Sequence, residues 1–257
     1  MKIHLLTLAI LSSLSVTRAQ YWQQKVDYIM EVTLDSETAR YNGTQKLIYT
    51  NNSPETHHKV FYHLYYNAFQ PGSEMAVRLK NAADKNRRFK VDIDSLTIEQ
   101  QGFLRVKNLT QNGTLVQTEV AETILEVTLN EPLLPGESTI LELNFEGQVP
   151  DVVRRAGKNS AEGVALSMAQ WYPKMAEYDV EGWNTDPYTG REFHGVWGDF
   201  DVKITLNKDF TVAASGYLQN ADEIGKGYSE RKRPKSKKSL VTWHFIAPEV
   251  HDFTWAA

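Results

Sequence analysis

Residues 25–34 read Lys-Val-Asp-Tyr-Ile-Met-Glu-Val-Thr-Leu, and this stretch decides the fold class. Apolar side chains recur at every second position from Val26 to Leu34, and polar side chains occupy the positions between them except at Ile29. Successive side chains of a β-strand point to opposite faces of a sheet, so a period of two puts one face in a core and the other in water. The stretch therefore predicts a half-buried β-strand.

Similar alternation recurs along the rest of the chain. The further predicted strands are Tyr41–Tyr49, Lys59–Tyr66, Phe89–Ile98, Phe103–Lys107, Thr123–Leu129, Thr139–Phe145, Phe200–Leu206, Thr211–Leu218 and Leu240–Ala247. Pairs of residues that favour turns occur at Asn42-Gly43, Asn112-Gly113 and Pro135-Gly136. Short alternating strands separated by turns predict an all-β fold, an antiparallel β-sandwich.

Two stretches depart from this pattern. Residues Ala68–Leu79 favour one short helix, although Pro71-Gly72 interrupts it. Residues 159–198 lack alternation and are rich in glycine and aromatic residues, which predicts a long, ordered, aromatic-rich loop. Loops of this length in compact domains usually carry function or contact another domain.

Composition and charge exclude several classes of protein. Hydrophobic residues make up 41% and charged residues 23% of the 257 residues, as in ordinary globular proteins. The 28 basic and 32 acidic residues give a net charge of −4, so we expect no nucleic-acid partner. Cysteine is absent, which excludes disulfides, thiolate zinc sites, iron–sulfur clusters and cysteine nucleophiles. Any metal would need His, Asp or Glu ligands.

The N-terminal residues have the features of an export signal. Lys2 precedes an apolar run over residues 5–14, and Thr17 and Ala19 supply the small residues of a cleavage site. This predicts a signal peptide over residues 1–19, one domain over residues 20–257 and a periplasmic or secreted bacterial protein. The apolar run is shorter than the roughly 20 residues that span a bilayer, so we expect no transmembrane segment.

The C-terminal residues 252–257 read Asp-Phe-Thr-Trp-Ala-Ala, an apolar, strand-like run without a polar tail. Natural domains usually end in a solvated or capped segment. We therefore expect that the chain is truncated before a further domain.

No complete catalytic motif occurs in the sequence. None of the 7 histidines belongs to a His-Glu-x-x-His pair, and there is no Gly-x-Ser-x-Gly elbow or phosphate-binding glycine loop. His57 and His58 follow Pro54 and are expected in a turn, while His63 and His244 are expected inside strands. The prediction is that this chain holds no metal site and no catalytic residue of its own.

The long loop and the strand after it collect carboxylates: Glu177, Asp179, Glu181, Asp186, Glu192, Asp199 and Asp201. A glycosidase needs two such groups across a bond, and calcium needs several converging oxygens. However, Phe200 and Val202 begin the inward face of the next strand, so we expect Asp199 and Asp201 to point into solvent with Lys203.

The aromatic residues of this loop are Trp171, Tyr172, Trp183, Tyr188, Phe193 and Trp197. They suit either a stacking platform for sugars or an interface or small core, and we favour the interface. Residues 231–238 form a basic run, for which a solvated hairpin tip is favoured over a polyanion site.

Several segments carry a resemblance to a known family. They are Leu129–Glu137 followed by Leu141–Gly147, Gln170–Lys174, Gly198–Val202, Ala214–Leu218, and Thr242–Phe245 running on to Val250–Ala257. In their order and spacing they resemble the N-terminal domain of M1-family zinc metallopeptidases, the aminopeptidase N and leukotriene A4 hydrolase group, and within it the secreted bacterial branch. The resemblance extends from about Val26 to Ala257.

The resemblance implies a saddle-like β-sandwich that precedes a thermolysin-like catalytic domain. In that family the catalytic domain carries a Gly-x-Met-Glu-Asn motif and a His-Glu-x-x-His zinc site, neither of which occurs in this chain. Zinc is thus implied as the cofactor of the full-length protein, with its ligands outside this chain. The implied partners are the protein's own C-terminal catalytic domain and a peptide substrate.

One substrate-binding residue is implied by the same resemblance. Family members place a Gln or Glu of this domain near the free amine of the substrate, shortly before an aromatic–Pro element. Gln170, before Trp171-Tyr172-Pro173, is the candidate, and an alignment anchored on Tyr172-Pro173 gives Glu162–Val164 instead. A neutral amide at Gln170 could accept a hydrogen bond from an ammonium group and orient the substrate. A Gln buried at a domain interface is the alternative, and the sequence does not choose between the two.

Two functions follow as hypotheses. In the first, the chain is the N-terminal, cleft-shaping domain of a zinc-dependent aminopeptidase and is inactive alone. In the second, it is a stand-alone exported β-sandwich that binds a glycan or a protein through Trp171, Trp183 and Trp197.

Overall fold

The computed structural model describes residues 21–81, 92–151, 156–160, 162–190, 194–225, 228–229 and 239–257. The predicted signal peptide and the basic run at 231–238 lie outside these residues. No helix in the described ranges is long and apolar enough to cross a membrane.

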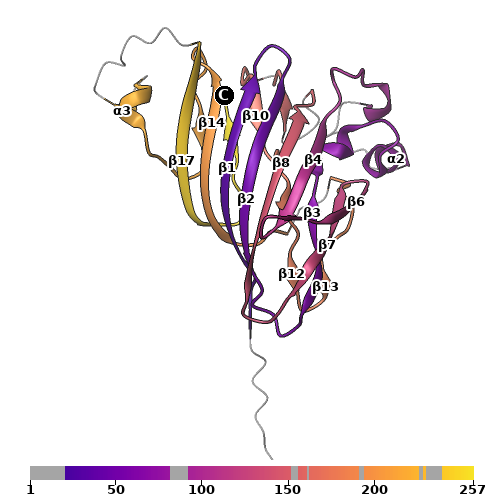
Figure 1. Cartoon of the computed structure of the whole chain (residues 1–257). Helices are drawn as coiled ribbons and strands as arrows, with labels where there is room; N and C mark the ends of the chain where they lie inside the picture. The colour runs from indigo at the N-terminus through magenta and orange to yellow at the C-terminus, as the bar shows by residue number, and fades with distance from the viewer. Residues whose placement is uncertain are drawn as a thin grey trace, which may run out of the picture.

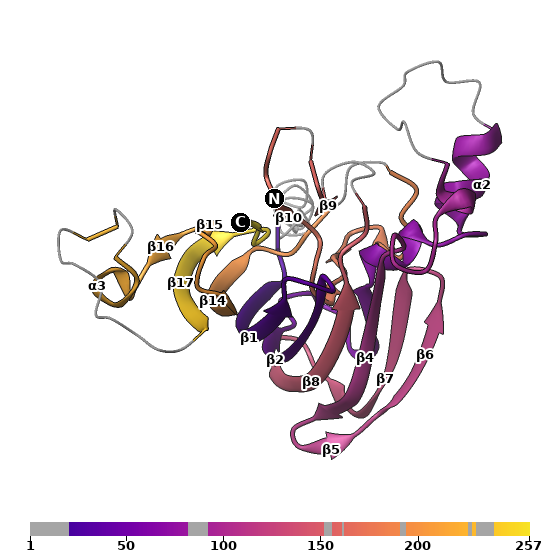
Figure 2. The same ribbon diagram turned by 90° about the horizontal axis from the view of Figure 1, so that it is seen from above.

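An eight-stranded sheet forms the larger layer of the fold (Figure 1). In spatial order its strands are β16 (Tyr217–Leu218), β17 (Leu240–Val250), β14 (Gly198–Asn207), β1 (Lys25–Asp35), β2 (Arg40–Thr50), β8 (Ser138–Gln148), β4 (Phe103–Gln111) and β5 (Thr114–Leu115). All neighbours are antiparallel except β1 and β14, which pair in parallel from Val26↔Gly198 to Thr33↔Thr205. The sheet is curved, with smaller sheets on its inner side (Figure 2).

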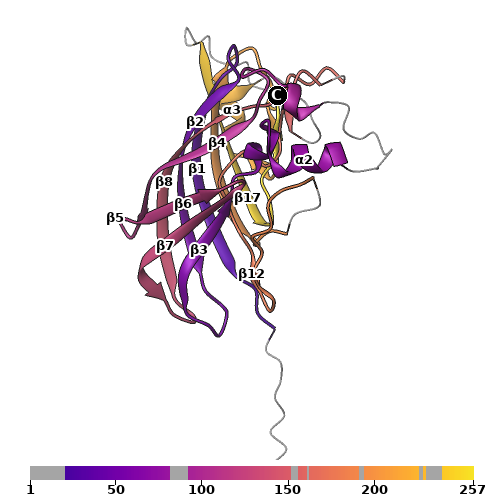
Figure 3. The same ribbon diagram turned by 90° about the vertical axis from the view of Figure 1, so that its right-hand side faces the viewer.

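The smaller sheets form the second layer. One contains β15 (Ala213–Ala214), β18 (Trp255–Ala256), β10 (Leu166–Met168) and β9 (Gly157–Lys158). Another contains β11 (Lys174–Met175), β3 (His57–His63), β7 (Ile124–Leu133) and β6 (Gln117–Ala121), which Figure 3 shows beside the large sheet. A hairpin joins β12 (Tyr178–Asp179) to β13 (Gly182–Trp183), and the helices are η1 (Tyr65–Phe69), α2 (Glu74–Asn81), η2 (Ile93–Ser95) and α3 (Ala221–Ile224). The predicted all-β sandwich is confirmed.

The alternation of residues 25–34 is also confirmed. β1 buries five side chains on the inner face of the sheet, namely Val26, Tyr28, Met30, Val32 and Leu34. The side chains between them lie on the uncovered face, where β1 continues the polar surface of its neighbours β2 and β14.

The turn predicted at Asn42-Gly43 is wrong, because both residues lie inside β2. The chain reverses instead directly after β1, where the Asp35 carboxylate accepts hydrogen bonds from Glu37 N (2.9 Å) and Thr38 Oγ1 (2.8 Å). An aspartate that binds the backbone two residues ahead stabilises a turn, so Asp35 was the true signal. His57 likewise begins β3 rather than lying in a turn.

The strand predicted at Phe89–Ile98 is wrong where it can be compared, because residues 92–98 contain η2 and no strand. Asp92 Oδ1 accepts a hydrogen bond from Asp94 N (3.1 Å), a local bond that competes with a sheet ladder. The single helix predicted at Ala68–Leu79 is two pieces, η1 and α2, separated at Pro71-Gly72.

The strand predicted at Thr211–Leu218 is also divided. β15 and β16 belong to different sheets, and the chain bends between them at Gly216, which has φ +79°. A Cβ atom at Gly216 would lie 2.3 Å from the carbonyl oxygen of Ile246. Only glycine permits both the conformation and the approach.

Two glycines in the middle of the large sheet face aromatic rings. Gly43 pairs with Phe145, and Gly147 pairs with Tyr41, between β2 and β8. A Cβ atom would lie 2.3 Å from Phe145 Cζ at Gly43 and 2.2 Å from Tyr41 Cζ at Gly147. The rings therefore occupy the space that a side chain would need and cover the glycine backbone.

Gly147→Ala should lower the free energy of unfolding by about 1–3 kcal/mol, because Tyr41 must move out of a packed core. Urea unfolding followed by circular dichroism measures the change. Thr44→Ala, on the uncovered face of β2, is the matched control and should change stability by less than about 0.5 kcal/mol. Equal effects of the two substitutions would contradict the packing described for Tyr41.

Candidate functional site

The loop region at residues 159–198 and the C-terminal segment at residues 251–257 form one unit inside the fold. β17 ends at Val250, and the chain then turns inward, burying Phe253 and Trp255. β18 pairs with β10, and Leu166 and Ala257 exchange two backbone hydrogen bonds of 2.9 Å each. The end of the chain is thus bound as a strand to the start of the loop region.

Trp171 fastens the two segments in the core. Its indole Nε1 donates a hydrogen bond to the carbonyl oxygen of Phe253 (3.1 Å), and its own carbonyl accepts one from the Tyr41 hydroxyl (2.7 Å). The ring is fully buried and packs edge-on against Tyr172 and Trp255, with centroids 5.3 and 6.2 Å away. Trp171 is therefore a core residue that also positions the C-terminal segment.

Lys174 is a buried cation at the same junction. Its side chain is only 2% exposed, and Nζ donates to the carbonyl oxygen of His251 (2.7 Å) and lies 3.4 Å from Asp252 Oδ1. The Tyr172 hydroxyl also donates to Asp252 Oδ1 (2.8 Å). Burial lowers the pKa of Lys174, and the Asp252 carboxylate opposes that shift.

Glu177 is a buried carboxyl group three residues further on. Burial, with a further contribution from Asp179, raises its pKa from 4.5 to about 7, while Lys174 acts in the opposite direction. Asn184 binds the backbone carbonyl of Glu177 (2.9 Å), which ties the hairpin of β12 and β13 to this position. Glu177 therefore changes charge near neutral pH.

An aromatic cluster surrounds that hairpin. The His57 ring lies 4.4 Å from Tyr178 and 5.1 Å from Trp183, centroid to centroid, and Trp22 stacks on Tyr178. The Tyr178 hydroxyl donates to the carboxylate of Glu55. Because the rings pack against one another, they form a small core. This agrees with the predicted alternative of an interface or small core and not with a stacking platform for sugars. Burial lowers the pKa of His57 to about 4.

His63, at the end of β3, also lies in an apolar environment. Its ring stacks on Tyr65 at 4.9 Å, and Nε2 hydrogen-bonds with the carbonyl oxygen of Asn184 (3.0 Å). Burial lowers the pKa of His63 to about 4, so its ring is neutral at pH 7. It is a packed strand histidine, as its sequence position predicts.

Gln170, the candidate substrate-binding residue, lies between β10 and Trp171. It is 1% exposed, has φ +61°, and its Nε2 has no hydrogen-bond partner among the described residues. A buried amide without a partner in a left-handed conformation is costly, so the site is strained. In this chain its side chain does not reach the surface.

Glu162 lies in the exposed turn that connects β9 to β10. Ser160 closes this turn: its carbonyl accepts from Gly163 N (3.1 Å) and its hydroxyl accepts from Val164 N (3.1 Å). The Glu162 side chain is exposed, and Val164 is 37% exposed. Since β10 pairs with β18, this turn projects from the sheet that contains the end of the chain.

The other predicted residues do not converge. Asp199 and Asp201 lie on the uncovered face as predicted, and Asp201 Oδ1 is 2.7 Å from His244 Nε2. Trp197 is half exposed and packs beside His251, whereas Trp171 is fully buried. The three tryptophans therefore make no shared stacking platform.

Glu192 and Phe193 lie outside the described residues. Within the described ranges, no three His, Asp or Glu side chains come together in a way that could hold a metal ion. Of the predicted carboxylates, Glu177 is buried, and Asp179 Oδ1 accepts a hydrogen bond from Glu181 N (2.8 Å).

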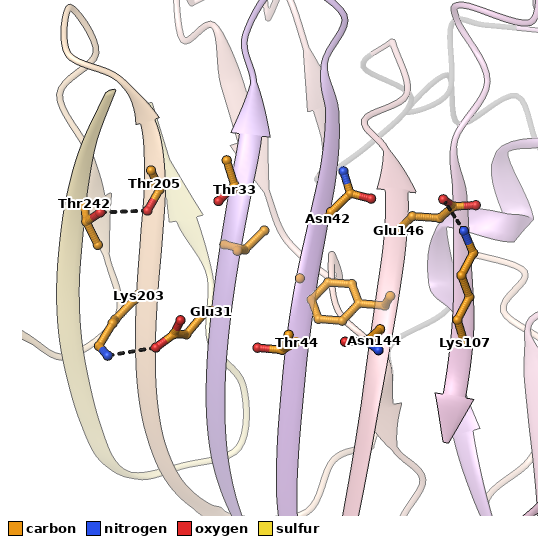
Figure 4. A pocket seen from close by; sticks show the side chains of 13 residues that line it. Glu31, Thr33, Asn42, Thr44, Lys107, Asn144, Glu146, Lys203, Thr205 and Thr242 are labelled. Atoms are coloured by element: carbon orange, nitrogen blue, oxygen red, sulfur yellow. Dashed lines mark hydrogen bonds and ion pairs between the residues drawn. The ribbon is translucent and has the colours of Figure 1, made fainter. Parts of the chain in front are cut away.

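The uncovered face of the large sheet contains a polar hollow of about 530 Å³ (Figure 4). Its charged side chains pair with one another, Lys203 with Glu31 (2.8 Å) and Lys107 with Glu146 (2.7 Å). Threonine and asparagine side chains occupy the strands between the two pairs. With its charges already paired and no exposed aromatic ring in its lining, the hollow resembles a solvated sheet face more than a binding site.

Comparisons with known proteins show what fold this is. No protein-family model matches the chain, and no curated protein matches its sequence. Among solved structures, a mutant M1 zinc metallopeptidase of Deinococcus radiodurans bound to a Tyr-Ser-Ala substrate aligns with TM-score 0.50 and 17% identity, over 91% of this chain and 42% of that chain. Another structure of the M1 zinc metallopeptidase from Deinococcus radiodurans aligns with TM-score 0.48 and 17% identity, over the same 91% and 42%.

A mutant two-domain M1 zinc metallopeptidase bound to L-tryptophan gives TM-score 0.48 and 16% identity, over 92% of this chain and 43% of that chain. At these identities the likeness shows the fold alone. The chain thus has a fold found in M1 zinc metallopeptidases and spans about 42% of the length of the structure it matches at TM-score 0.50.

Removing either partner of the buried Lys174–Asp252 pair should be strongly destabilising. We expect Lys174→Met and Asp252→Asn each to lower the free energy of unfolding by about 3–5 kcal/mol, because each leaves a buried charge unpaired. The double variant should cost clearly less than the sum of the two. Urea unfolding of the four proteins gives the coupling energy.

The exposed pair of Lys25 and Asp27, 3.2 Å apart, is the matched control for this cycle. Its two substitutions, Lys25→Met and Asp27→Asn, should couple by less than about 1 kcal/mol. Additive effects at Lys174 and Asp252 would contradict the pairing.

Glu177 should make the domain less stable as pH rises. Its folded pKa of about 7 lies above the ordinary 4.5, so the native state binds more protons than the unfolded state between these values. The free energy of unfolding therefore falls from about pH 4.5 to pH 7, by about 1–3 kcal/mol. Glu177→Gln should remove this fall, as measured by urea unfolding at pH 5 and pH 8.

His57 and His63 act in the opposite direction, since their lowered pKa values make stability rise between about pH 4 and pH 6.5. Subtracting the pH dependence of the variant's unfolding free energy from that of the parent leaves the contribution of Glu177, because His57 and His63 contribute equally to both proteins. Glu181→Gln, at an exposed position of the same hairpin, should leave the pH dependence of the parent unchanged. A Glu177→Gln protein with the parent's pH dependence would contradict the prediction.

Proposed function

We propose that this chain is the N-terminal domain of a zinc-dependent aminopeptidase of the M1 type, and that it shapes one wall of the substrate cleft in a longer protein. The observation that carries the proposal is the likeness in fold to an M1 zinc metallopeptidase over 91% of this chain and 42% of that chain. The ordered segments Gln170–Lys174 and Val250–Ala257, which carry the sequence resemblance, support it because they bind each other in the core.

In this proposal residues 1–19 are a signal peptide that directs the protein to the periplasm or outside the cell, and residues 20–257 are one domain. The zinc ligands and the catalytic residues belong to the catalytic domain that is the partner of this one. The described residues bring together no ligand set for a metal, so no chemical step is assigned to them. Their role is to bind and orient a peptide.

Two side chains are proposed for contact with the amino group of the substrate. Gln170 is proposed because of the sequence resemblance, and its side-chain oxygen is the atom that would accept a hydrogen bond from an ammonium group. Its burial requires that the cleft extend into the core of this domain. Glu162 is supported by its exposure on the β9–β10 turn and by its negative charge, which complements an ammonium group. We favour Glu162 as the contact and Gln170 as the residue that holds the adjoining loop in place.

The test uses the longer protein that contains this chain and a His-Glu-x-x-His domain, assayed on aminoacyl anilides. Glu162→Gln should raise KM or lower kcat/KM by about tenfold, because uniform binding of the amine is lost. Gln170→Ala should have a smaller effect on KM and should lower thermal stability. The isolated chain with added zinc should show no turnover.

Three outcomes would contradict the proposal: turnover by the isolated chain, a coding sequence without a downstream His-Glu-x-x-His motif, or unchanged kinetics in both variants. If Gln170→Ala raises KM strongly and Glu162→Gln leaves KM unchanged, Gln170 and not Glu162 contacts the amino group of the substrate. Asp209→Asn, at an exposed turn after β14, is the control for charge removal and should leave KM unchanged.

A further inference from the structure

The hairpin of β4 and β5 opens into a split between two sheets. β4 and β5 pair at Thr110↔Leu115 and Gln111↔Thr114, and Val116 N still binds the carbonyl oxygen of Leu109 (3.2 Å). The chain then leaves β4 and continues as β6, which pairs with β7. Among the described strands, the first half of β4 therefore pairs with β8 alone, and β6 pairs with β7 alone.

A hollow of about 590 Å³ lies in this split. It is lined from one side by Leu104–Lys107 of β4, from the other by Val120 and Glu122, and at one end by Asn67 and residues 70–73. Figure 3 shows β4 and β6 on the same flank of the molecule. The hollow thus lies between two strand edges.

The edge of β4 presents backbone groups to the hollow. Leu104 N donates to Asn67 Oδ1 (2.9 Å), so the backbone groups of Leu104 point away from β8. The register with β8 is unbroken from Phe103 to Lys107, and alternate residues of an antiparallel strand point to the same side. Val106 N–H and C=O therefore also face the hollow.

The edge of β6 presents groups to the same space. Ala121 pairs with Ile124 across the two-residue turn Glu122-Thr123, and such a closing pair is hydrogen-bonded. Alternation then directs the backbone groups of Val120 away from β7. The Asn67 side chain bridges Leu104 and Glu122 across the split, so Val106 and Val120, each two residues away in the sequence, lie on its two sides.

The hydrogen bonds of the Asn67 side chain show how wide the split is. Its Oδ1 accepts from Leu104 N (2.9 Å), and its Nδ2 donates to the carbonyl oxygen of Glu122 (3.3 Å). A peptide group in a β-strand does the same, because its oxygen accepts from one neighbouring strand and its N–H donates to the other. The Asn67 amide therefore stands where a peptide group of one intervening strand would stand, and the gap is one strand wide.

The side chains around the hollow set the chemistry of an occupant. Val106 and Val120 supply apolar surface, whereas Leu64 and Leu104 border the hollow but are buried in the core. On the other face of β4, Arg105 and Lys107 share one carboxylate, that of Glu146, at 3.6 and 2.7 Å. Among the described residues Glu146 is the one acidic partner of these two cations, which favours an additional negative charge beside them.

We propose that this split binds an extended peptide segment of a partner protein, which adds as a strand between β4 and β6. Its backbone bonds to Val106 on one edge and to Val120 on the other. An apolar side chain packs against Val106 and Val120, and an acidic side chain on the opposite face lies beside Arg105 and Lys107. Strand addition supplies affinity through main-chain bonds and specificity through alternate side chains. The site is independent of the proposed peptidase function.

The first measurement is amide hydrogen exchange on the chain itself, followed by NMR. In the free protein Val106 and Val120 should exchange about a hundredfold faster than Arg105, Lys107 and Glu119, whose amides bond to β8 and β7. Adding about 1 mM of the peptide Ac-Thr-Val-Glu-Val-Thr-NH2 should slow Val106 and Val120 by about tenfold and leave the other three unchanged. Protection of Val106 and Val120 in the free protein would mean that a segment of this chain already fills the split, which would overturn the proposal.

Two N-methylated forms of the peptide test the bonding to both edges. Methylation of the two Val nitrogens blocks bonds to one edge, and methylation of the Thr and Glu nitrogens blocks bonds to the other. Each should weaken binding by about tenfold or more in a calorimetric titration. If either methylated form binds as tightly as the parent peptide, strand addition between the two edges is wrong.

Variants of the chain provide a second control. Val120→Pro removes the N–H that faces the hollow without removing a bond to β7, so the fold should persist while peptide binding falls by about tenfold. Val120→Thr retains the N–H and should keep most of the affinity. Circular dichroism checks both folds, and equal affinities of the two variants would overturn the proposal.

Discussion

The hydrogen bond from the buried Lys174 ammonium to the carbonyl oxygen of His251, with Asp252 beside it, is the constraint on which the second layer of the fold depends. It determines where the chain enters the core after β17. From that point Trp171 holds Phe253, and β18 can pair with β10 and β15. Without this junction β18 would not be held between β10 and β15.

Apolar packing alone would not define this junction. Phe253 and Trp255 are two residues apart, so a shift of the segment by two positions would still direct an aromatic ring inward. A cation that binds one carbonyl and one carboxylate has no such equivalent position. The buried pair costs desolvation, and a hydrophobic replacement of both partners could be equally stable, but it would permit the shift. Lys174 therefore determines register more than stability.

Much of the fold could be predicted from the sequence because it rests on periodicity. The alternation in residues 25–34 predicted which face of β1 is buried, and the phase of Phe200 and Val202 predicted that Asp199 and Asp201 lie outside. Predictions failed where a local hydrogen bond from a polar side chain decided the backbone conformation. The turn lies at Asp35 and not at Asn42-Gly43, and Asp92 begins the helix η2 where a strand was predicted. These bonds have no periodic signal.

The candidate site was less predictable, because its geometry depends on contacts between distant residues. Nothing near Gln170 in the sequence indicates that the C-terminal segment returns and that Phe253 binds the neighbouring Trp171, so the sequence left a buried Gln and a substrate contact as equal alternatives. The same holds for Asn67, which is an ordinary polar residue in the sequence. Only the approach of β4 and β6 places an acceptor 2.9 Å from Leu104 and a donor 3.3 Å from Glu122 on one amide. The Asn67 amide can form both bonds only because a gap one strand wide lies between β4 and β6. That gap arises because the chain leaves β4 after the hairpin and continues as β6, which pairs with β7.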